Sequence, residues 1–213
     1  MVMHLADRLD LPLRERNALL QAAGFAAAFP ETPLDHDSLA PIRAALERML
    51  AQHMPMPAVL FDRYWNLIDA NPTAAAMFGV TPGGEPLNIV ALTAGNPDFT
   101  AQFENWPEVA HHMMERLKLE LVASGGDPKL EEVMAVLGAD PVFDDPAPHG
   151  IGDEPLIYLR LNVGGQAIGL FSCIAQFGTA RNITVNDLRL ELFFPEDEAS
   201  EQVLRGLAGA VMS

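Results

Sequence analysis

The sequence predicts an α+β fold, in which helices cover one face of an antiparallel five-stranded sheet and a short helical segment precedes the sheet. Two observations support this class. Apolar residues recur at helical spacing before Pro57 and again in the middle of the chain, whereas strand-like alternation follows Pro57 and returns over the last third. Strands and helices therefore occupy separate runs, which is typical of α+β proteins.

The part of the chain before Pro57 is predicted to be helical with breaks. Residues 1–9 and 13–23 each place apolar residues at helical spacing, and Gly24 is suited to end the second helix. A Pro-containing stretch then leads to a third helix over residues 39–53. We interpret this third helix as a packing element, either in the core or between domains.

Two short strands are predicted after Pro57, over residues 58–62 and 64–69. Asn71 then opens a short helix over residues 73–78. An asparagine at this position is suited to cap the helix, because its side-chain oxygen can accept a bond from a free backbone N–H. Asn71 is therefore either a cap or a ligand contact.

Two longer helices are predicted in the middle of the chain. The first begins at Asn105 and ends at Gly125, and the second covers residues 127–138 with Asp127 as its cap. Residues 140–154 are rich in Pro, Gly and Asp, which indicates a mobile surface loop.

The last third is predicted to be a three-stranded meander. Residues 157–163 alternate, Gly164 and Gly165 suit a two-residue hairpin turn, and residues 166–177 continue as a long strand. Residues 184–194 alternate again. We expect their leucines to face inward and their charged neighbours outward, with a short helix over residues 199–207 closing the chain. The inward set is Leu188, Leu190 and Leu192, and the outward set is Asp187, Arg189 and Glu191.

Two strands, a helical stretch and a three-stranded meander are the arrangement of a PAS domain. A sheet covered by helices leaves room for an apolar pocket between the layers. His112 and Arg116 are one helical turn apart and can hold a carboxylate, or can simply be solvated. The apolar residues among the candidates named below can instead belong to the hydrophobic core, without contact to a ligand. The candidate ligand-binding residues are Phe61, Trp65, Asn71, Trp106, His112, Met113, Arg116, Phe171 and Phe177.

The composition of the chain excludes several classes of function. The formal net charge of −16 repels phosphate backbones, so we expect this chain alone to bind DNA poorly. No apolar run reaches the ~20 residues of a membrane span, and we expect a cytoplasmic protein with no membrane partner. A single cysteine excludes a disulfide framework and a multi-thiolate zinc site. We interpret Cys173 as a small buried thiol, and we predict no catalytic or metal-binding residue.

Several segments resemble one bacterial family, the MmyB-like regulators, which join an XRE-type helix-turn-helix to a PAS-like ligand-binding domain. Residues 9–25 resemble the joint between the two domains, and residues 57–67, continuing into 70–72, resemble the entry into the sheet. The final strands also match. The matching pieces there are residues 171–172, 177–179 and 190–195.

The resemblance covers nearly the whole chain and implies three parts. Residues 1–24 are the remnant of the helix-turn-helix domain and its joint, residues 25–56 are a linker and connecting helix, and residues 57–213 are the PAS-like ligand-binding domain. Only the final helix of the DNA-binding bundle, residues 1–9, is expected here. DNA is therefore contacted only through the missing portion.

The resemblance also implies a function, a sensor that binds a small apolar molecule and modulates DNA binding as a homodimer. A long-chain fatty acid or similar lipid is the implied ligand, and no other cofactor is expected. One alternative is a pocketless dimerisation module built on the helix over residues 39–53. A small-molecule enzyme is the remaining alternative, although the sequence shows no activated nucleophile.

Overall fold

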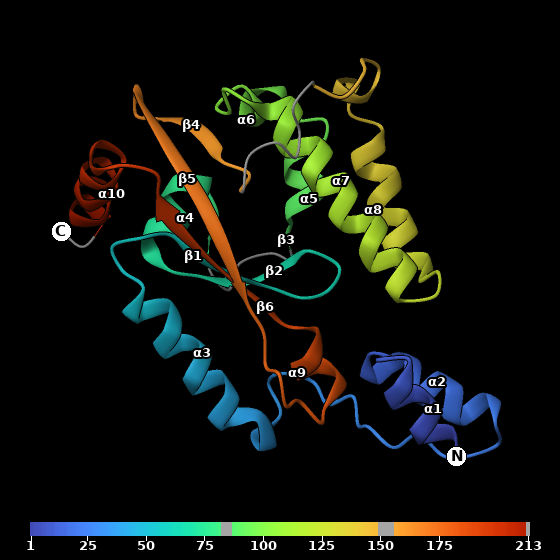
Figure 1. The fold of residues 1–213 in the computed structure, drawn as a ribbon. Helices are drawn as coiled ribbons and strands as arrows, with labels where there is room; N and C mark the ends of the chain where they lie inside the picture. Colours follow the sequence, from blue (N-terminus) through green and yellow to red (C-terminus); the bar gives the residue numbers. More distant parts are fainter. Residues whose placement is uncertain (82–86, 149–155, 212–213) are drawn as a thin grey trace.

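The structure, a computed structural model, describes residues 1–81, 87–148 and 156–211. It confirms the α+β class, with helices packed around an antiparallel sheet (Figure 1). Within the described residues the sheet has six strands in the order β3-β2-β1-β6-β5-β4, so a short edge strand adds to the five predicted. The strands are β1 (Ala58–Phe61), β2 (Asn66–Ala70), β3 (Leu87–Asn88), β4 (Leu159–Val163), β5 (Gln166–Ala175) and β6 (Arg189–Pro195).

Strand β6 joins the two halves of the sheet. It pairs with β1 on one side and with β5 on the other, so that Leu192 lies opposite both Ala58 and Cys173. The last strand of the chain therefore lies beside the first, and β2 and β4 flank this central trio. This order, with the main group of helices inserted between β2 and β4, is PAS-like.

The predicted hairpin turn between β4 and β5 is present. Gly164 and Gly165 have φ values of +59° and +84°, which is the left-handed pair that a two-residue hairpin turn requires. Val163 and Gln166 close the turn as paired residues. The pairing fixes which β5 side chains share a face with those of β4 and β6.

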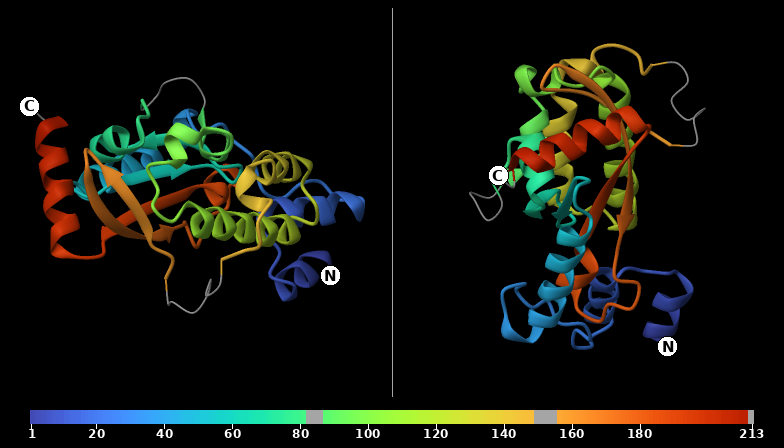
Figure 2. Two further views of the ribbon diagram at one scale, coloured as in Figure 1. Left: turned by 90° about the horizontal axis from the view of Figure 1, so that it is seen from above. Right: turned by 90° about the vertical axis from the view of Figure 1, so that its left-hand side faces the viewer.

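Helices after β2 cover one face of the sheet, and their core contains Phe193 of β6 and Leu170 of β5 (Figures 1 and 2). The closing helix α10 (Glu198–Val211) packs on α4 and β5 at the edge of this layer. Of the loop predicted over residues 140–154, residues 141–143 form a short 3-10 helix, and 149–155 lie outside the described residues. The covering elements are α4 (Pro72–Phe78), α5 (Ile89–Thr93), α6 (Pro97–Thr100), α7 (Trp106–Ala123), α8 (Pro128–Gly138) and η2 (Pro141–Phe143).

Helix α3 (Ala40–Gln52), which follows the short 3-10 helix η1 (Asp37–Leu39), covers the opposite face of the sheet (Figure 1). Leu46 and Leu50 of α3 pack on Leu60, Leu188 and Leu190 in a second apolar cluster. The expectation of helices on one face only was therefore incomplete, because a second core lies under α3. The interpretation of this helix as a packing element agrees with its position.

Because helices cover both faces of the sheet, the prediction for the last strand was partly wrong. Leu190 and Leu192 face α3, whereas Phe193 belongs to the core on the other face. Because side chains alternate along a strand, Glu191 shares the face of Phe193 and points into the protein rather than toward solvent. The alternating pattern was read correctly, but the sequence could not show that both faces are covered.

Two smaller expectations about this region were wrong. The predicted strand over residues 184–194 begins with a short helix, α9 (Ile183–Asp187), in which Asn182 caps the N-terminus through a bond from Val185 N–H. Cys173 was expected to be buried but is exposed, because it points to the side of β5 opposite the main core. Within the described residues, no helix is long and apolar enough to cross a membrane.

Helices α1 (Val2–Arg8) and α2 (Leu13–Ala22) lie at one end of the molecule, beside α9 (Figure 2). Arg14 of α2 forms an ion pair with Asp187 at 3.1 Å and another with Glu31. Asn17 of α2 donates to the Phe29 carbonyl at 2.7 Å and is itself buried. The ion pair with Asp187 thus connects α2 to α9, which directly precedes the central strand β6.

Candidate functional site

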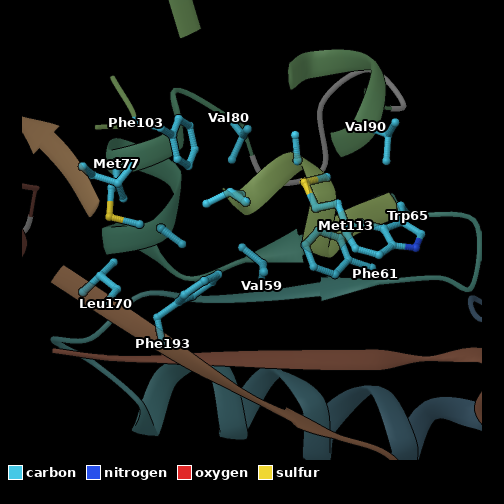
Figure 3. Packing of buried hydrophobic residues seen from close by; sticks show 14 of the residues in the cluster. Val59, Phe61, Trp65, Met77, Val80, Val90, Phe103, Met113, Leu170 and Phe193 are labelled. Atoms are coloured by element: carbon cyan, nitrogen blue, oxygen red, sulfur yellow. The ribbon is translucent and has the colours of Figure 1, made fainter. Parts of the chain in front are cut away.

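A cavity of about 540 Å³ lies between the sheet and helices α5, α6 and α7. Its wall is largely aromatic and aliphatic, and Figure 3 shows Phe61, Trp65 and Met113 side by side above β1. A few polar side chains interrupt this apolar wall. These are Thr93, His112 and Arg116 from the helical layer and Ser172 and Glu191 from the sheet.

Six of the nine candidate residues line this cavity. They share two elements, the β1–β2 hairpin and helix α7. On α7 the lining positions recur at steps of three or four residues, with the adjacent His112 and Met113 side by side, so they form one broad face of the helix. The six are Phe61, Trp65, Trp106, His112, Met113 and Arg116.

Helix α7 is held over the sheet at its N-terminus by Asn105. The Asn105 side chain donates to the Tyr158 carbonyl at 2.8 Å and accepts from Arg160 N–H at 3.0 Å, at the start of β4. Pro107 suits the first turn, where a missing N–H costs nothing. The sequence predicted Asn105 as a helix cap, whereas its side chain instead ties α7 to the neighbouring strand.

The hairpin between β1 and β2 places Trp65 in the cavity wall. Asp62 accepts bonds from the N–H groups of Tyr64 and Asn66 at 2.8 and 3.0 Å, which tightens the turn around Trp65. Trp65 has φ +66°, a conformation that costs a non-glycine residue about 1 kcal/mol or more. Its ring is buried and stacks on Phe61 at 6.3 Å. The packing of this ring offsets the backbone strain.

The guanidinium of Arg116 is the main positive group of the cavity. It lies 4.6 Å from the centre of the Trp65 ring, in a cation–π contact. Among the described residues it has no hydrogen bond or ion pair partner. Its N–H donors therefore remain available to an acceptor that enters the cavity.

Two neighbours of Arg116 have shifted pKa values. Burial lowers the pKa of His112, and the charge of Arg116 lowers it further, so that the neutral imidazole is favoured near pH 7. Burial raises the pKa of Glu120, against the opposing effect of Arg116 and Arg189. The neutral His112 ring can thus donate one N–H to a ligand.

Asn71 lies outside the cavity wall and acts as a structural cap. Its Oδ1 accepts from Ala74 N–H at 3.0 Å, and its Nδ2 donates to the Met56 carbonyl at 2.7 Å. The side chain is 2% exposed and has no remaining capacity for a ligand. Of the two roles open for Asn71, the structure places it in the capping role.

Phe171 and Phe177 also lie away from the cavity. Phe171 stacks on Phe194 at 5.6 Å on the far side of the sheet, and Phe177 packs in the cluster under α3. Their aromatic character made them candidates. Side chains alternate between the two faces of a strand, however, and in β5 it is Ser172 and Ile174 that face the cavity, whereas Phe171 faces the other way.

Two polar residues on the cavity floor, Ser172 and Glu191, were not among the predicted site residues. Ser172 donates to Glu191 at 2.5 Å, and Glu191 is 9% exposed. The available signal was the position of Glu191 two residues before Phe193, since these two must share a face of β6. Among the described residues, no cluster of three His, Cys, Asp or Glu could hold a metal ion.

Comparison with solved structures finds a distant match. The PAS domain of BvgS from Bordetella pertussis matches with 14% identity and a TM-score of 0.32, over 78% of this chain and 96% of that one. The strand order, rather than this distant match, identifies the fold. Comparison with curated proteins finds no match. The profile of the MmyB-like transcription regulator ligand binding domain matches residues 42–207, most of the chain. The chain therefore belongs to the family of MmyB-like transcription regulator ligand-binding domains.

Proposed function

We propose that the cavity is the sensory site of this regulatory domain and binds a fatty acid or similar amphiphile. The observation that carries the proposal is a largely apolar cavity of about 540 Å³ that contains the guanidinium of Arg116, which has no hydrogen-bond or ion-pair partner among the described residues. Small-molecule sites typically have volumes of about 300–1,000 Å³ and combine apolar walls with a few polar groups. The chain thus offers both a place for an apolar tail and a partner for a polar head.

The head group of the ligand binds Arg116 and His112. A guanidinium forms two parallel bonds with a carboxylate, and the neutral His112 adds a third donor. Arg116 is held in place by the Trp65 ring, so less side-chain freedom is lost on binding. The tail lies among the aromatic side chains near Phe103 and Phe193. We propose binding without turnover.

Binding changes the position of the helices that precede Pro57 and thereby the affinity of the complete regulator for DNA. Arg63 supports this coupling, because it lies two residues before Trp65 and its guanidinium is 3.7 Å from Glu15 of α2. The same hairpin therefore contacts both the cavity and the N-terminal helices. DNA is contacted by a helix-turn-helix portion outside this chain, in a cytoplasmic homodimer.

Denaturing extraction of the purified protein, followed by mass spectrometry, identifies the molecule bound in the cavity. Titration with dodecanoic acid then measures the affinity for a fatty acid. We expect a near-stoichiometric lipid. Met113→Trp fills the cavity and should abolish dodecanoate binding, whereas Leu119→Trp, on the same helix but 70% exposed, should not. Arg116→Met should weaken binding about tenfold or more, since it removes charge-assisted bonds worth about 1.5–3 kcal/mol.

Dodecanoate binding that Met113→Trp leaves intact would place the ligand elsewhere. The coupling between ligand binding and DNA affinity is tested separately, by measuring the affinity of the complete regulator for its operator with and without bound acid. An unchanged operator affinity would refute the coupling. If extraction and titration both found no ligand, the cavity would not be a sensory site, and a dimerisation module built on α3 would be favoured instead.

A further inference from the structure

We infer that the ligand carries, besides its anionic head, a hydroxyl group that donates a hydrogen bond to Glu191 on the floor of the cavity. This inference rests on the proposed function and specifies the class of ligand. It predicts a hydroxylated long-chain acid rather than a plain fatty acid. The starting observation is that the cavity has two poles of opposite charge, Arg116 in the helical layer and Glu191 in the sheet.

Glu191 is placed toward the ligand by strand phase and by its neighbours. In β6 it shares a face with Phe193, and its cross-strand partner in β5 is Ile174. Ser172 lies diagonally across the same face. All four of these residues line the cavity, so the carboxylate is part of its floor.

The Glu191 carboxylate is almost fully buried with one partner. Ser172 is its only hydrogen-bond partner among the described residues, and Glu191 forms no ion pair with any of their cationic groups. An ionised carboxylate can accept about four hydrogen bonds. A buried carboxylate with a single bond is costly unless the ligand or water supplies further donors.

The site accepts hydrogen bonds and offers none. Ser172 has one hydroxyl proton, and it is directed to Glu191 at 2.5 Å. Both side chains therefore present only lone pairs to the cavity. A ligand carboxylate or carbonyl would be repelled there, whereas a hydroxyl or ammonium group would be bound.

A hydroxyl fits this position better than an ammonium group. The surrounding wall is apolar, with Ile174 and Phe193 beside the carboxylate. An ammonium group must lose a far larger hydration energy to enter such a place than a hydroxyl. The two poles together then select an acid whose carboxylate binds Arg116 and whose hydroxyl binds Glu191.

The test compares dodecanoic acid with its monohydroxylated isomers by calorimetric titration. The isomers carry the hydroxyl next to the carboxyl group, at the following carbon, in mid-chain or at the far end. We expect at least one isomer to bind the unmodified chain about tenfold or more tightly than dodecanoic acid, since a hydrogen bond to a charged group contributes about 1.5–3 kcal/mol.

Glu191→Leu should abolish this preference and strengthen binding of dodecanoic acid, because it removes the buried carboxylate. Ser172→Ala should retain the preference, since Glu191 remains as acceptor. Glu115→Leu removes an exposed carboxylate of α7 and should change nothing, which controls for net charge. Far-UV circular dichroism and thermal unfolding establish that each variant is folded.

The outcomes separate this inference from the proposed function. If dodecanoic acid binds and no isomer binds more tightly, the hydroxyl inference is wrong and the sensory cavity stands. A preference that survives in Glu191→Leu also overturns the inference. If the unmodified chain binds none of the acids, both proposals fail together.

Discussion

Asn71 shows how much one buried amide can contribute to this fold. Besides capping α4, its Oδ1 accepts from Ala58 N–H at 3.2 Å, and its Nδ2 donates to the Leu50 carbonyl at 3.3 Å. One side chain thus joins the end of α3, the start of β1 and the start of α4. These are the elements between which the sheet domain begins.

Replacing Asn71 by alanine should destabilise the chain by about 3 kcal/mol or more. The change removes a helix cap and leaves several buried backbone groups without partners, each costing about 1–3 kcal/mol. Urea unfolding followed by circular dichroism measures the effect. Asn96→Ala is the matched control, because Asn96 caps the short α6 through a single bond at 3.2 Å. Equal losses in the two variants would contradict the joining role of Asn71.

Two polar residues of the cavity, His112 and Arg116, were within reach of sequence reasoning, whereas Glu191 was not. His112 and Arg116 could be paired from helical spacing alone, because three- and four-residue steps always share a helix face. The spacing of Glu191 and Phe193 shows that they share a face, but it does not show which face is buried, and a charged residue in an alternating strand normally faces solvent. Only the packing of α3 on the leucine face shows that this glutamate points into the cavity.

At the scale of elements, the β1–β2 hairpin connects the helical layer with the N-terminal helices. Arg63 lies 3.5 Å from Asp127, which caps α8, as well as 3.7 Å from Glu15 of α2. The adjacent Tyr64 donates to Asp127 at 2.9 Å, and burial together with this bond raises the pKa of Tyr64 to about 12. The hairpin therefore holds two helices from different parts of the molecule.

Arg63→Met should loosen α2 without unfolding the sheet. Arg63 is 8% exposed, and its loss leaves the partly buried Glu15 without its ion pair. Removing one member of such a pair costs about 1–3 kcal/mol, between the values for exposed and buried pairs. We expect backbone amides of α2 to exchange with deuterium about tenfold faster, as measured by mass spectrometry.

The control for this experiment is Arg205→Met in α10, which breaks an exposed ion pair with Glu201 far from the hairpin. It should leave α2 exchange unchanged. If Arg63→Met also has no effect on α2, the attachment depends on Arg14 and Asn17 instead. The hairpin would then not be the connection between the cavity and α2.

The charge of the whole molecule opposes its compact state. The chain has 29 acidic and 13 basic residues, and self-repulsion at this net charge of −16 destabilises folding. Salt screens charges over about 8 Å at 0.15 M ionic strength. The melting temperature should therefore rise by a few degrees when sodium chloride is raised from about 0.01 M to about 0.15 M.

Differential scanning calorimetry at pH 7 tests the salt dependence. An equal osmolality of sucrose is the control, since it acts without screening charge. A melting temperature that falls as salt is added would show that the ion pairs of α2 and the hairpin outweigh the general repulsion. In that case the interface between these elements would be the most salt-sensitive part of the molecule.

Local sequence patterns were enough to predict the α+β class, the change of period at Pro57, the hairpin at Gly164 and Gly165, and the family. These features depend on patterns within short segments, which can be recognised without knowing which other segments pack against them. The sequence also predicted that α7 presents His112, Met113 and Arg116 to one side, because helix geometry is local.

The face of each strand that forms the cavity floor, in contrast, depends on contacts between distant parts of the chain. A period of two shows that Leu190 and Glu191 point in opposite directions, but either face of a two-sided sheet can be buried. The choice depends on α3 lying under one face and α7 over the other, and on β6 pairing with β1 across a long stretch of sequence. These non-local contacts placed Phe171 outside the cavity and Glu191 within it.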